Sequence, residues 1–191
     1  MYVLSKVFTP ISYLRIKHPE KRYFDFILPV ITSLILISII GLLPKTIAII
    51  GKDSLISLVN GILQILSGFY IASMAAVSTF QKKGMDDVMR GSAPTLRDEE
   101  LTRRKFLAYL FGYLAFMSIA MYFVGGATQL MHSSIKEMSL LSLPFMKNFL
   151  LFIYLIAICN IIYTTTLGMF FMIDKMHDEE PELKTNNGNN E

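Results

Sequence analysis

Polar and apolar positions divide the chain into four long apolar runs separated by charged segments. None of the runs contains Asp, Glu, Lys or Arg, and they cover 26–44, 54–81, 106–135 and 148–173. A helix of about 20 residues crosses the roughly 30 Å hydrocarbon core of a bilayer, so each run is long enough to span it. The runs are continuous rather than alternating, which favours helices over barrel strands. The pattern predicts an all-α membrane protein with transmembrane helices near 24–44, 55–80, 104–131 and 146–174.

The composition supports this interpretation. Of the 191 residues, 53% are hydrophobic and 17% are charged, and the mean hydropathy is +0.48. Soluble domains carry roughly 25% charged residues, and their amphipathic helices place a charge on the outer face every few residues. An ordinary soluble enzyme and a disordered chain are therefore excluded. We expect a cytoplasmic segment over 1–22, a four-helix transmembrane domain over 23–174 with a loop over 81–105, and an acidic, disordered tail over 175–191.

The first 22 residues carry apolar side chains at near-helical spacing, among them Val7 and Ile11, with Lys6 and Arg15 close by. This mixture is typical of a short helix that lies on an anionic membrane surface, and a solvated leader fits it equally well. No small-residue cleavage site follows, and Pro10 interrupts the apolar run, so we expect the segment to be retained.

Lysine and arginine residues concentrate in the segments on one side of the predicted membrane. The N-terminal segment, the loop over 81–105 and the tail hold 14 of them, whereas the two short connections hold Lys45, Lys52, Lys136 and Lys147. Lys and Arg near the ends of spans resist translocation. The asymmetry therefore predicts that both termini and the long loop lie in the cytoplasm.

The long loop is expected to lead directly into the third helix. Thr95 followed by Asp98 resembles a capping box in which Asp replaces the usual Glu. Glu99 and Glu100 lie four residues before Arg103 and Arg104, the order that favours salt bridges along a helix. The spacing predicts a helix that begins below the membrane and enters it unbroken.

Charged residues on this side of the membrane are candidates for contact with a cytoplasmic protein or with anionic lipid. The acidic tail would be repelled by anionic lipid and suits a protein or water instead. Seven bases and five acids leave the loop a net charge of +2, which argues against direct binding of nucleic acid. The candidate contact residues are Lys82, Lys83, Arg90, Arg97, Arg103, Arg104, Lys105, Asp178, Glu179 and Glu180.

Residue types that carry catalysis are scarce. The single cysteine, Cys159, lies mid-span and indicates packing, and the three histidines fall on both sides of the membrane, too far apart to share a metal ion. Coupled transporters usually place an ionisable group inside a span. The nearest such group is Asp25, which we interpret as a helix N-cap or a partner of Arg22. We therefore expect no enzyme and no catalytic, cofactor or metal site.

Polar and small residues inside the membrane concentrate on the second and fourth helices. On the second helix they recur every four residues and form one ridge, and a related stripe follows on the fourth. These ridges serve either as helix-packing contacts or as the lining of an oligomeric pore, whose neutral amides would favour water or weakly selected ions. The residues are Asn60, Gln64, Gly68, Ala72, Ala76, Asn160, Thr164 and Gly168.

The third helix is rich in aromatic residues, which usually face lipid or fill a core, and it carries a glycine pair near its outer end. Such a pair bends or loosens a helix. A more specific hypothesis is that the outer end of the third helix responds to disturbance of the cell envelope. The helix would then transmit this change to the cytoplasmic loop over 81–105. The residues in that role are Gly125, Gly126, Gln129 and His132.

This outline, with helices over 55–80 and 146–174 and the loop over 81–105, resembles the small membrane subunit of the Kiwa anti-phage defence system. The resemblance covers most of the chain as a pattern of spans. It implies a bacterial inner-membrane homo-oligomer, a tetramer, that senses infection and holds a cytoplasmic DNA-binding partner. Holins, immunity proteins of contact-dependent toxins and other four-span subunits share the same outline.

We therefore expect an oligomeric membrane scaffold or sensor that recruits and controls a cytoplasmic effector. The alternative is an oligomeric pore or channel of the holin type. A transporter is disfavoured because no charge lies within the four apolar runs.

Overall fold

The computed structural model describes residues 6–45, 47–79, 81, 84–88, 93–137 and 144–175. In this part of the chain four helices are long and apolar enough to cross a membrane, which confirms the all-α transmembrane architecture. They cover Pro19–Leu42, Leu55–Thr79, Arg103–Leu130 and Phe145–Ile173. The last three agree with the predicted bounds to within a residue. The first begins five residues earlier than predicted.

The first span consists of three consecutive segments. It opens with α2 (Pro19–Arg22), continues through a π-helical turn, η2 (Tyr23–Ile27), and is completed by α3 (Leu28–Leu42). Proline at the first position of α2 suits a helix start, because the N–H that it lacks would have no partner there. The other spans are α4 (Leu55–Thr79), α5 (Arg103–Leu130) and α7 (Pro144–Phe170), which a second π turn, η4 (Phe171–Lys175), extends.

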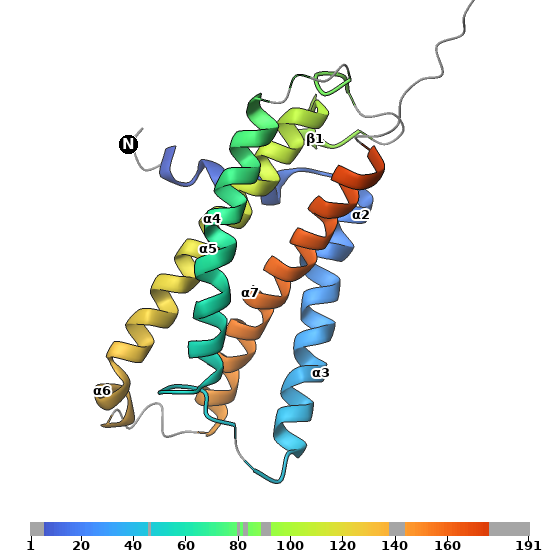
Figure 1. The fold of residues 1–191 in the computed structure, drawn as a ribbon. Coiled ribbons are helices and arrows are strands. Elements are labelled where there is room, and N and C mark those ends of the chain that lie inside the picture. The colour runs from blue at the N-terminus through green and yellow to red at the C-terminus, as the bar shows by residue number, and fades with distance from the viewer. Residues whose placement is uncertain are drawn as a thin grey trace, which may run out of the picture.

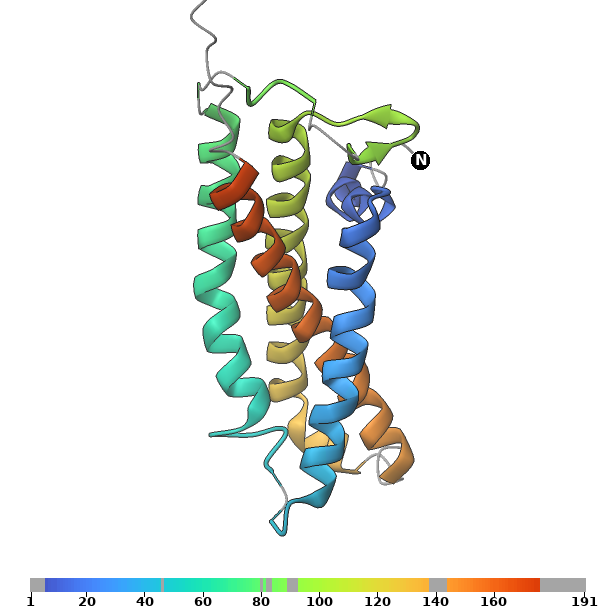
Figure 2. The same ribbon diagram turned by 90° about the vertical axis from the view of Figure 1, so that its right-hand side faces the viewer.

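The helices pack as two antiparallel pairs. α4 makes its main contacts with α5, and α3 with α7, while contacts between α5 and α7 join the pairs (Figure 1). α7 runs obliquely across α5 (Figure 2). In an 18-residue apolar stretch of each span, 39% of the residues are buried in α5 and in α7, but only 17% in the first span and in α4. α5 and α7 therefore form the centre of the bundle, and α3 and α4 flank it.

Large apolar side chains cover the outside of the bundle. Leu34, Ile35 and Ile39 of α3, like Leu58 and Ile65 of α4, expose about half of their surface or more. Soluble proteins rarely expose contiguous apolar surface on this scale, whereas hydrocarbon solvates it without cost. The outer surface therefore suits a lipid environment.

One end of the bundle carries a small folded cap, which we define as residues 6–18, 84–88 and 93–102. The N-terminal part of the cap runs across the bundle rather than along it (Figure 1). At the opposite end the described chain forms the connection over 43–45 and 47–54 and α6 (His132–Glu137). The regular elements of the cap are a 3-10 helix, η1 (Thr9–Arg15), and a hairpin of β1 (Thr95–Leu96) and β2 (Glu99–Glu100).

Backbone hydrogen bonds and apolar contacts hold the cap together. Lys17 and Thr95 exchange two backbone bonds of 2.9 and 3.1 Å, which ties the N-terminal segment to β1. Ile16, Met85 and Leu101 are buried in a core that continues into the bundle. The cap is therefore packed onto the spans.

The segment before α5 forms a hairpin, and the predicted capping box at Thr95 is wrong. Arg97 and Asp98 have φ angles of 54° and 66°, so both lie in the left-handed region that a two-residue hairpin turn requires. The backbone of Thr95 is already paired with Lys17. α5 begins only after Thr102, whose hydroxyl accepts a hydrogen bond from the third helical N–H.

α4 and α5 approach closely at Gly125, near the end away from the cap. A methyl group added at Gly125 would lie 2.3 Å from Oδ1 of Asn60, whereas one added at Gly126 would meet nothing within 4 Å. Nδ2 of Asn60 donates to the carbonyl of Tyr122 at 3.4 Å. Packing against Asn60 therefore requires glycine at position 125 and not at position 126.

We expect Gly125→Ala to lower the free energy of unfolding by about 1–3 kcal/mol, because Asn60 must move and lose its bond to Tyr122. Gly126→Ala is the matched control, expected to leave stability unchanged or slightly higher, since alanine favours a helix. Thermal unfolding of the purified protein in detergent measures both. Adding Asn60→Ala to Gly125→Ala should recover part of the loss. Equal melting temperatures for the two single variants would contradict the packing role.

Candidate functional site

A buried ion pair lies where the cap meets the spans. Lys21 of α2 and Asp25 of η2 are one helical turn apart and form a salt bridge, with 3% and 0% of their side chains exposed. Charges persist in a protein interior only when they are paired and their remaining hydrogen-bonding groups are satisfied. The elements around Asp25 supply those hydrogen bonds.

Segments that are distant in sequence converge on Asp25. Its Oδ1 accepts hydrogen bonds from the hydroxyls of Tyr13 in η1 (3.2 Å) and Thr164 in α7 (3.3 Å). Its backbone carbonyl accepts from Nδ2 of Asn160 (2.7 Å), and Oδ1 of Asn160 accepts from the hydroxyl of Tyr113 in α5 (2.7 Å). We define the Asp25 cluster as Tyr13, Lys21, Asp25, Tyr113, Asn160 and Thr164.

A proline explains why the Asp25 carbonyl turns to another helix. In an α-helix this carbonyl would accept from the N–H four residues on, but that residue is Pro29, which has none. The chain forms the π turn η2 here, and the amide of Asn160 donates to the carbonyl. Turns of this kind recur at functional sites. The proline thus helps to fix the point at which α7 docks on the first span.

Two tyrosines complete the surroundings of the ion pair. Nζ of Lys21 lies 4.1 Å from the centre of the Tyr13 ring, and the Tyr13 and Tyr113 rings stack with centres 4.9 Å apart. Burial, and then the charge of Asp25, hold the pKa of the Tyr13 phenol well above its usual value. The phenol therefore keeps its proton and remains a hydrogen-bond donor.

The sequence prediction for Asp25 is wrong in both forms. Asp25 does not cap a helix, because α2 begins six residues earlier at Pro19, and its partner is Lys21 rather than Arg22, whose side chain is exposed. Side chains three or four residues apart on a helix are close to each other. The spacing alone therefore did not distinguish Lys21 from Arg22 as the partner of Asp25. The usable signals were the four-residue steps from Lys21 to Asp25 and from Asp25 to Pro29.

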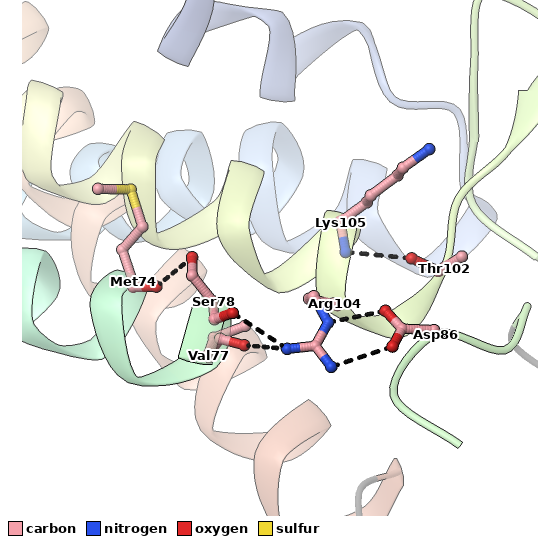
Figure 3. Close-up of polar contacts among 7 residues, drawn as sticks. All are labelled: Met74, Val77, Ser78, Asp86, Thr102, Arg104 and Lys105. Carbon is pink, nitrogen blue, oxygen red and sulfur yellow. Dashed lines mark hydrogen bonds and ion pairs between the residues drawn. The ribbon is translucent and has the colours of Figure 1, made fainter. Parts of the chain in front are cut away.

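Arg104 joins the cap to α4. Its Nη1 donates to the carbonyls of Val77 (3.0 Å) and Ser78 (3.2 Å) near the end of α4 (Figure 3). Its Nε and Nη2 donate to the two carboxylate oxygens of Asp86 (2.7 and 3.1 Å). The last carbonyls of a helix lack donors within the helix, and a cation there also suits the helix dipole. One side chain at the start of α5 therefore completes α4 and holds the segment between the two helices.

The same segment satisfies the first N–H groups of α5. The backbone N–H groups of Arg103 and Arg104 donate to the carbonyls of Asp87 (3.2 Å) and Met85 (2.9 Å). Gly84, with a φ of 88°, makes the turn that brings these carbonyls into place. We define the Arg104 junction as Arg104 with Val77, Ser78 and Asp86. It binds the end of α4, the start of α5 and the cap into one unit.

The acidic partner of Arg104 differs from the predicted one. Glu99 and Glu100 lie in β2, so the helix pairs predicted between them and the arginines do not form. Asp86 takes that place, and its hydrogen bond from Arg104 holds the pKa of this exposed carboxyl below its usual value.

The predicted ridge of α4 lies mostly on the outside of the protomer. Gln64, Gly68, Ala72 and Ala76 are exposed, and only Asn60, which contacts α5, is partly buried. The face of α4 that packs inward is the opposite one, formed by Ile56, Val59, Leu63, Tyr70 and Val77. The small-residue ridge therefore faces away from the other helices of the chain.

The polar residues of α7 lie inside the protomer and do not meet the ridge of α4. Asn160 and Thr164 belong to the Asp25 cluster. Gly168 packs against α5, where an added methyl group would lie 2.8 Å from Cδ2 of Leu110. Further hydroxyl contacts of α7 reach α4 and α3 through Thr165–Tyr70 (2.6 Å) and Tyr163–Thr32 (2.7 Å).

The residues of the hypothetical sensing end lie beside the start of α4. Gly125 makes the close contact with α4 described above. In the orientation that satisfies both atoms of its amide, Gln129 donates to the carbonyl of Gly51 (3.2 Å) and accepts from the N–H of Ser57 (3.1 Å). His132 is partly buried at the start of α6. This end of α5 is therefore bonded to its neighbour helix.

The candidate contact residues divide into three groups. Arg97 at the hairpin tip and Lys105 in the first turn of α5 are exposed, whereas Arg103 and Arg104 are partly buried at the junction. The others lie outside the described residues: Lys82, Lys83, Arg90, Asp178, Glu179 and Glu180.

No group of three His, Cys, Asp or Glu side chains that suits a metal ion occurs among the described residues, and Cys159 is a free, buried thiol. Comparison with models of protein families, with curated proteins and with solved structures gave no match. The Asp25 cluster, the Arg104 junction and the cap are the features of the described chain that bear on function.

We expect Asp25→Ala to lower the free energy of unfolding by about 3–5 kcal/mol, because it leaves the buried ammonium of Lys21 without a counter-charge. Replacing both charges, Lys21→Met with Asp25→Leu, should recover most of that loss. Arg22→Ala is the control and should change little, since Arg22 is exposed. Thermal unfolding in detergent tests all three. A double variant as unstable as Asp25→Ala would argue against the ion pair as the cause.

Proposed function

We propose that the protein is an oligomeric scaffold or sensor subunit of the bacterial inner membrane that recruits and controls a cytoplasmic effector in anti-phage defence. The observation that carries this proposal is the folded cap. Within the described residues it is the largest structure outside the spans, and it is bonded to the start of α5 through Asp86 and to the first span through Tyr13. A surface of this kind can bind a protein and respond to the helices beneath it.

The charge asymmetry supports a cytoplasmic position for the cap. The segments on the cap side of the spans hold 14 of the 18 Lys and Arg residues. Such an excess keeps a segment on the cytoplasmic side during insertion. The short connections at the opposite end leave little surface for a receptor outside.

Two routes would carry a helix movement to the cap. The Arg104 junction bonds the end of α4 to Asp86. The Asp25 cluster joins η1 to α7 through Asp25 and stacks Tyr13 of η1 on Tyr113 of α5. Coupling between distant sites travels through packed networks that have alternative arrangements. A stimulus that shifts α4 against α5 at Asn60 and Gly125 would therefore change the contacts of Arg104.

The exposed face of the hairpin suits a protein partner. Arg97, Asp98, Glu99 and Glu100 are all exposed, and Lys17 pairs with Asp98 at 3.7 Å on the surface. Interspersed charges of both signs give a pattern that a complementary protein surface matches, whereas nucleic acid requires a positive one.

Photo-crosslinking from the hairpin tests recruitment. With a photoreactive residue in place of Arg97, we expect the full-length protein in cells to crosslink to a cytoplasmic protein. The same residue at Lys52, at the opposite end, should give no such product. Reversing two exposed charges, Glu99→Lys with Glu100→Lys, should reduce the Arg97 product about tenfold, because like charges oppose each other across the contact.

The abundance of the protein in the membrane is the control for the charge reversal, since neither glutamate is buried. Crosslinking of equal yield from Arg97 and Lys52, or a yield that the charge reversal leaves unchanged, would contradict recruitment by the cap.

The outward ridge of α4 supports the oligomeric part of the proposal. Gln64 places an amide at hydrocarbon depth, and Gly68, Ala72 and Ala76 continue the same face. Small residues let helices approach closely in lipid, and an amide can both donate and accept across a symmetric contact. The resemblance noted above suggests four copies. The alternative function is a pore, in which the same Gln64 amides would line a passage.

Ala72→Leu is expected to shift the protein from oligomers to single protomers, because the larger side chain keeps the α4 ridges apart. Native mass spectrometry in mild detergent measures the change, and Ile65→Leu, on an exposed part of the same helix, is the control. An unchanged oligomer would exclude the ridge as the interface. Ion flux from liposomes that Gln64→Ala abolishes would favour the pore over the scaffold.

A further inference from the structure

An open groove of about 660 Å³ lies between η1, the hairpin and the first turns of α5. Segments distant in sequence bring four cationic side chains to it. Lys6 and Arg15 come from the N-terminal segment, Arg97 from the hairpin turn and Lys105 from α5. The acid among the lining residues is Glu99, so the lining carries a net formal charge of +3.

The four cations have no carboxylate partner in the described part of the chain. The ion pairs formed there involve Lys17, Lys21 and Arg104 instead. All four groove cations are exposed and are therefore accessible to a ligand. An anion bound between them would offset the repulsion among their positive charges. Phosphate oxygens accept charge-assisted hydrogen bonds from both ammonium and guanidinium groups.

Apolar side chains form the rest of the groove. Phe8, Ile11 and Tyr109 line it beside the buried Leu96 and Leu101. A small soluble anion would leave this apolar surface without a partner. A ligand that combines a phosphate with hydrocarbon chains would cover both kinds of surface.

The groove adjoins the start of the apolar run of α5, the position at which lipid headgroups would lie. Lys105 is the last charged residue of α5 before its apolar run, which begins at Phe106. Phe8, which is 51% exposed, packs edge-on against Phe116 with ring centres 6.3 Å apart. Phe116 is eleven residues beyond Lys105, about 16 Å further along the helix. The groove therefore leads from the headgroup layer toward the hydrocarbon.

We propose that this groove is a binding site for an anionic phospholipid. The four cations hold the phosphate, and the acyl chains follow Phe8 and Tyr109 into the bilayer. Anionic headgroups are concentrated in the cytoplasmic leaflet, on the side to which the cap is assigned. The bound lipid would press η1 against α5, next to Tyr13 of the Asp25 cluster. The site shares Arg97 and Glu99 with the hairpin face proposed to recruit the effector, but its test uses the purified protein alone, so the two proposals can fail separately.

The test uses the full chain reconstituted in vesicles of equal phosphatidylglycerol and phosphatidylcholine and then extracted in mild detergent. Mass spectrometry counts the lipids that remain bound. We expect the wild type to retain phosphatidylglycerol about tenfold in preference, and Arg15→Gln with Arg97→Gln to reduce this preference to about twofold or less. Lys45→Gln with Lys52→Gln, at the opposite end, is the matched control and should retain the preference.

A variant that binds more lipid separates the binding site from misfolding, because a misfolded protein would lose binding rather than gain it. Glu99→Gln removes the acid from the groove and should raise the retention of phosphatidylglycerol about twofold or more. Equal retention of the two lipids by the wild type, or equal loss in the groove and control variants, would overturn the proposal. Displacement of the lipid by millimolar glycerol phosphate would also overturn it, because the site would then recognise free phosphate rather than a phospholipid.

Discussion

A buried charge needs a counter-charge and hydrogen bonds, and this requirement at Lys21 and Asp25 organises the cap end of the molecule. Neither side chain reaches water, so each neighbouring segment contributes a polar group. Tyr13 and Thr164 bind the carboxylate, and Asn160 binds the carbonyl that Pro29 leaves without a donor. The ion pair thereby fixes the position of η1 and α7 against the first span.

Similar polar contacts determine how the other helices pair, because lipid gives apolar helices little reason to prefer one another. Asn60 fits against Gly125 between α4 and α5, and Gly168 admits Leu110 between α7 and α5. Hydroxyl bonds then set α7 against its other neighbours through Tyr70–Thr165 and Thr32–Tyr163. The apolar side chains make the helices compatible with the membrane, while single polar or glycine residues determine which helices pack against each other.

This division of roles explains what the sequence predicted. Runs without charges predicted the last three spans to within a residue, because span length depends mainly on bilayer thickness and local hydropathy, whereas the first span begins five residues earlier, within a charged segment. The Asp25 cluster was missed because it assembles Tyr13, Tyr113 and Asn160 from three helices, and no local spacing encodes such a meeting. The hairpin at Thr95 was missed because its backbone pairs with Lys17, nearly eighty residues away. The sequence assigned the ridge of α4 and the polar residues of α7 to one role, but their surroundings are opposite, because most of the ridge is exposed and the α7 residues are buried.

The two attachments of the cap have a joint mechanical consequence. Arg104 binds the cap to the α4–α5 pair, whereas Asp25, which is also bonded to Thr164 of α7, binds it to the other pair through Tyr13. Tyr13 belongs to both, since it stacks on Tyr113 of α5 and donates to Asp25. The two pairs therefore cannot slide past each other without breaking a bond to a buried carboxylate or withdrawing Tyr13 from its stack. Either change is costly, so the bundle favours discrete arrangements over gradual ones.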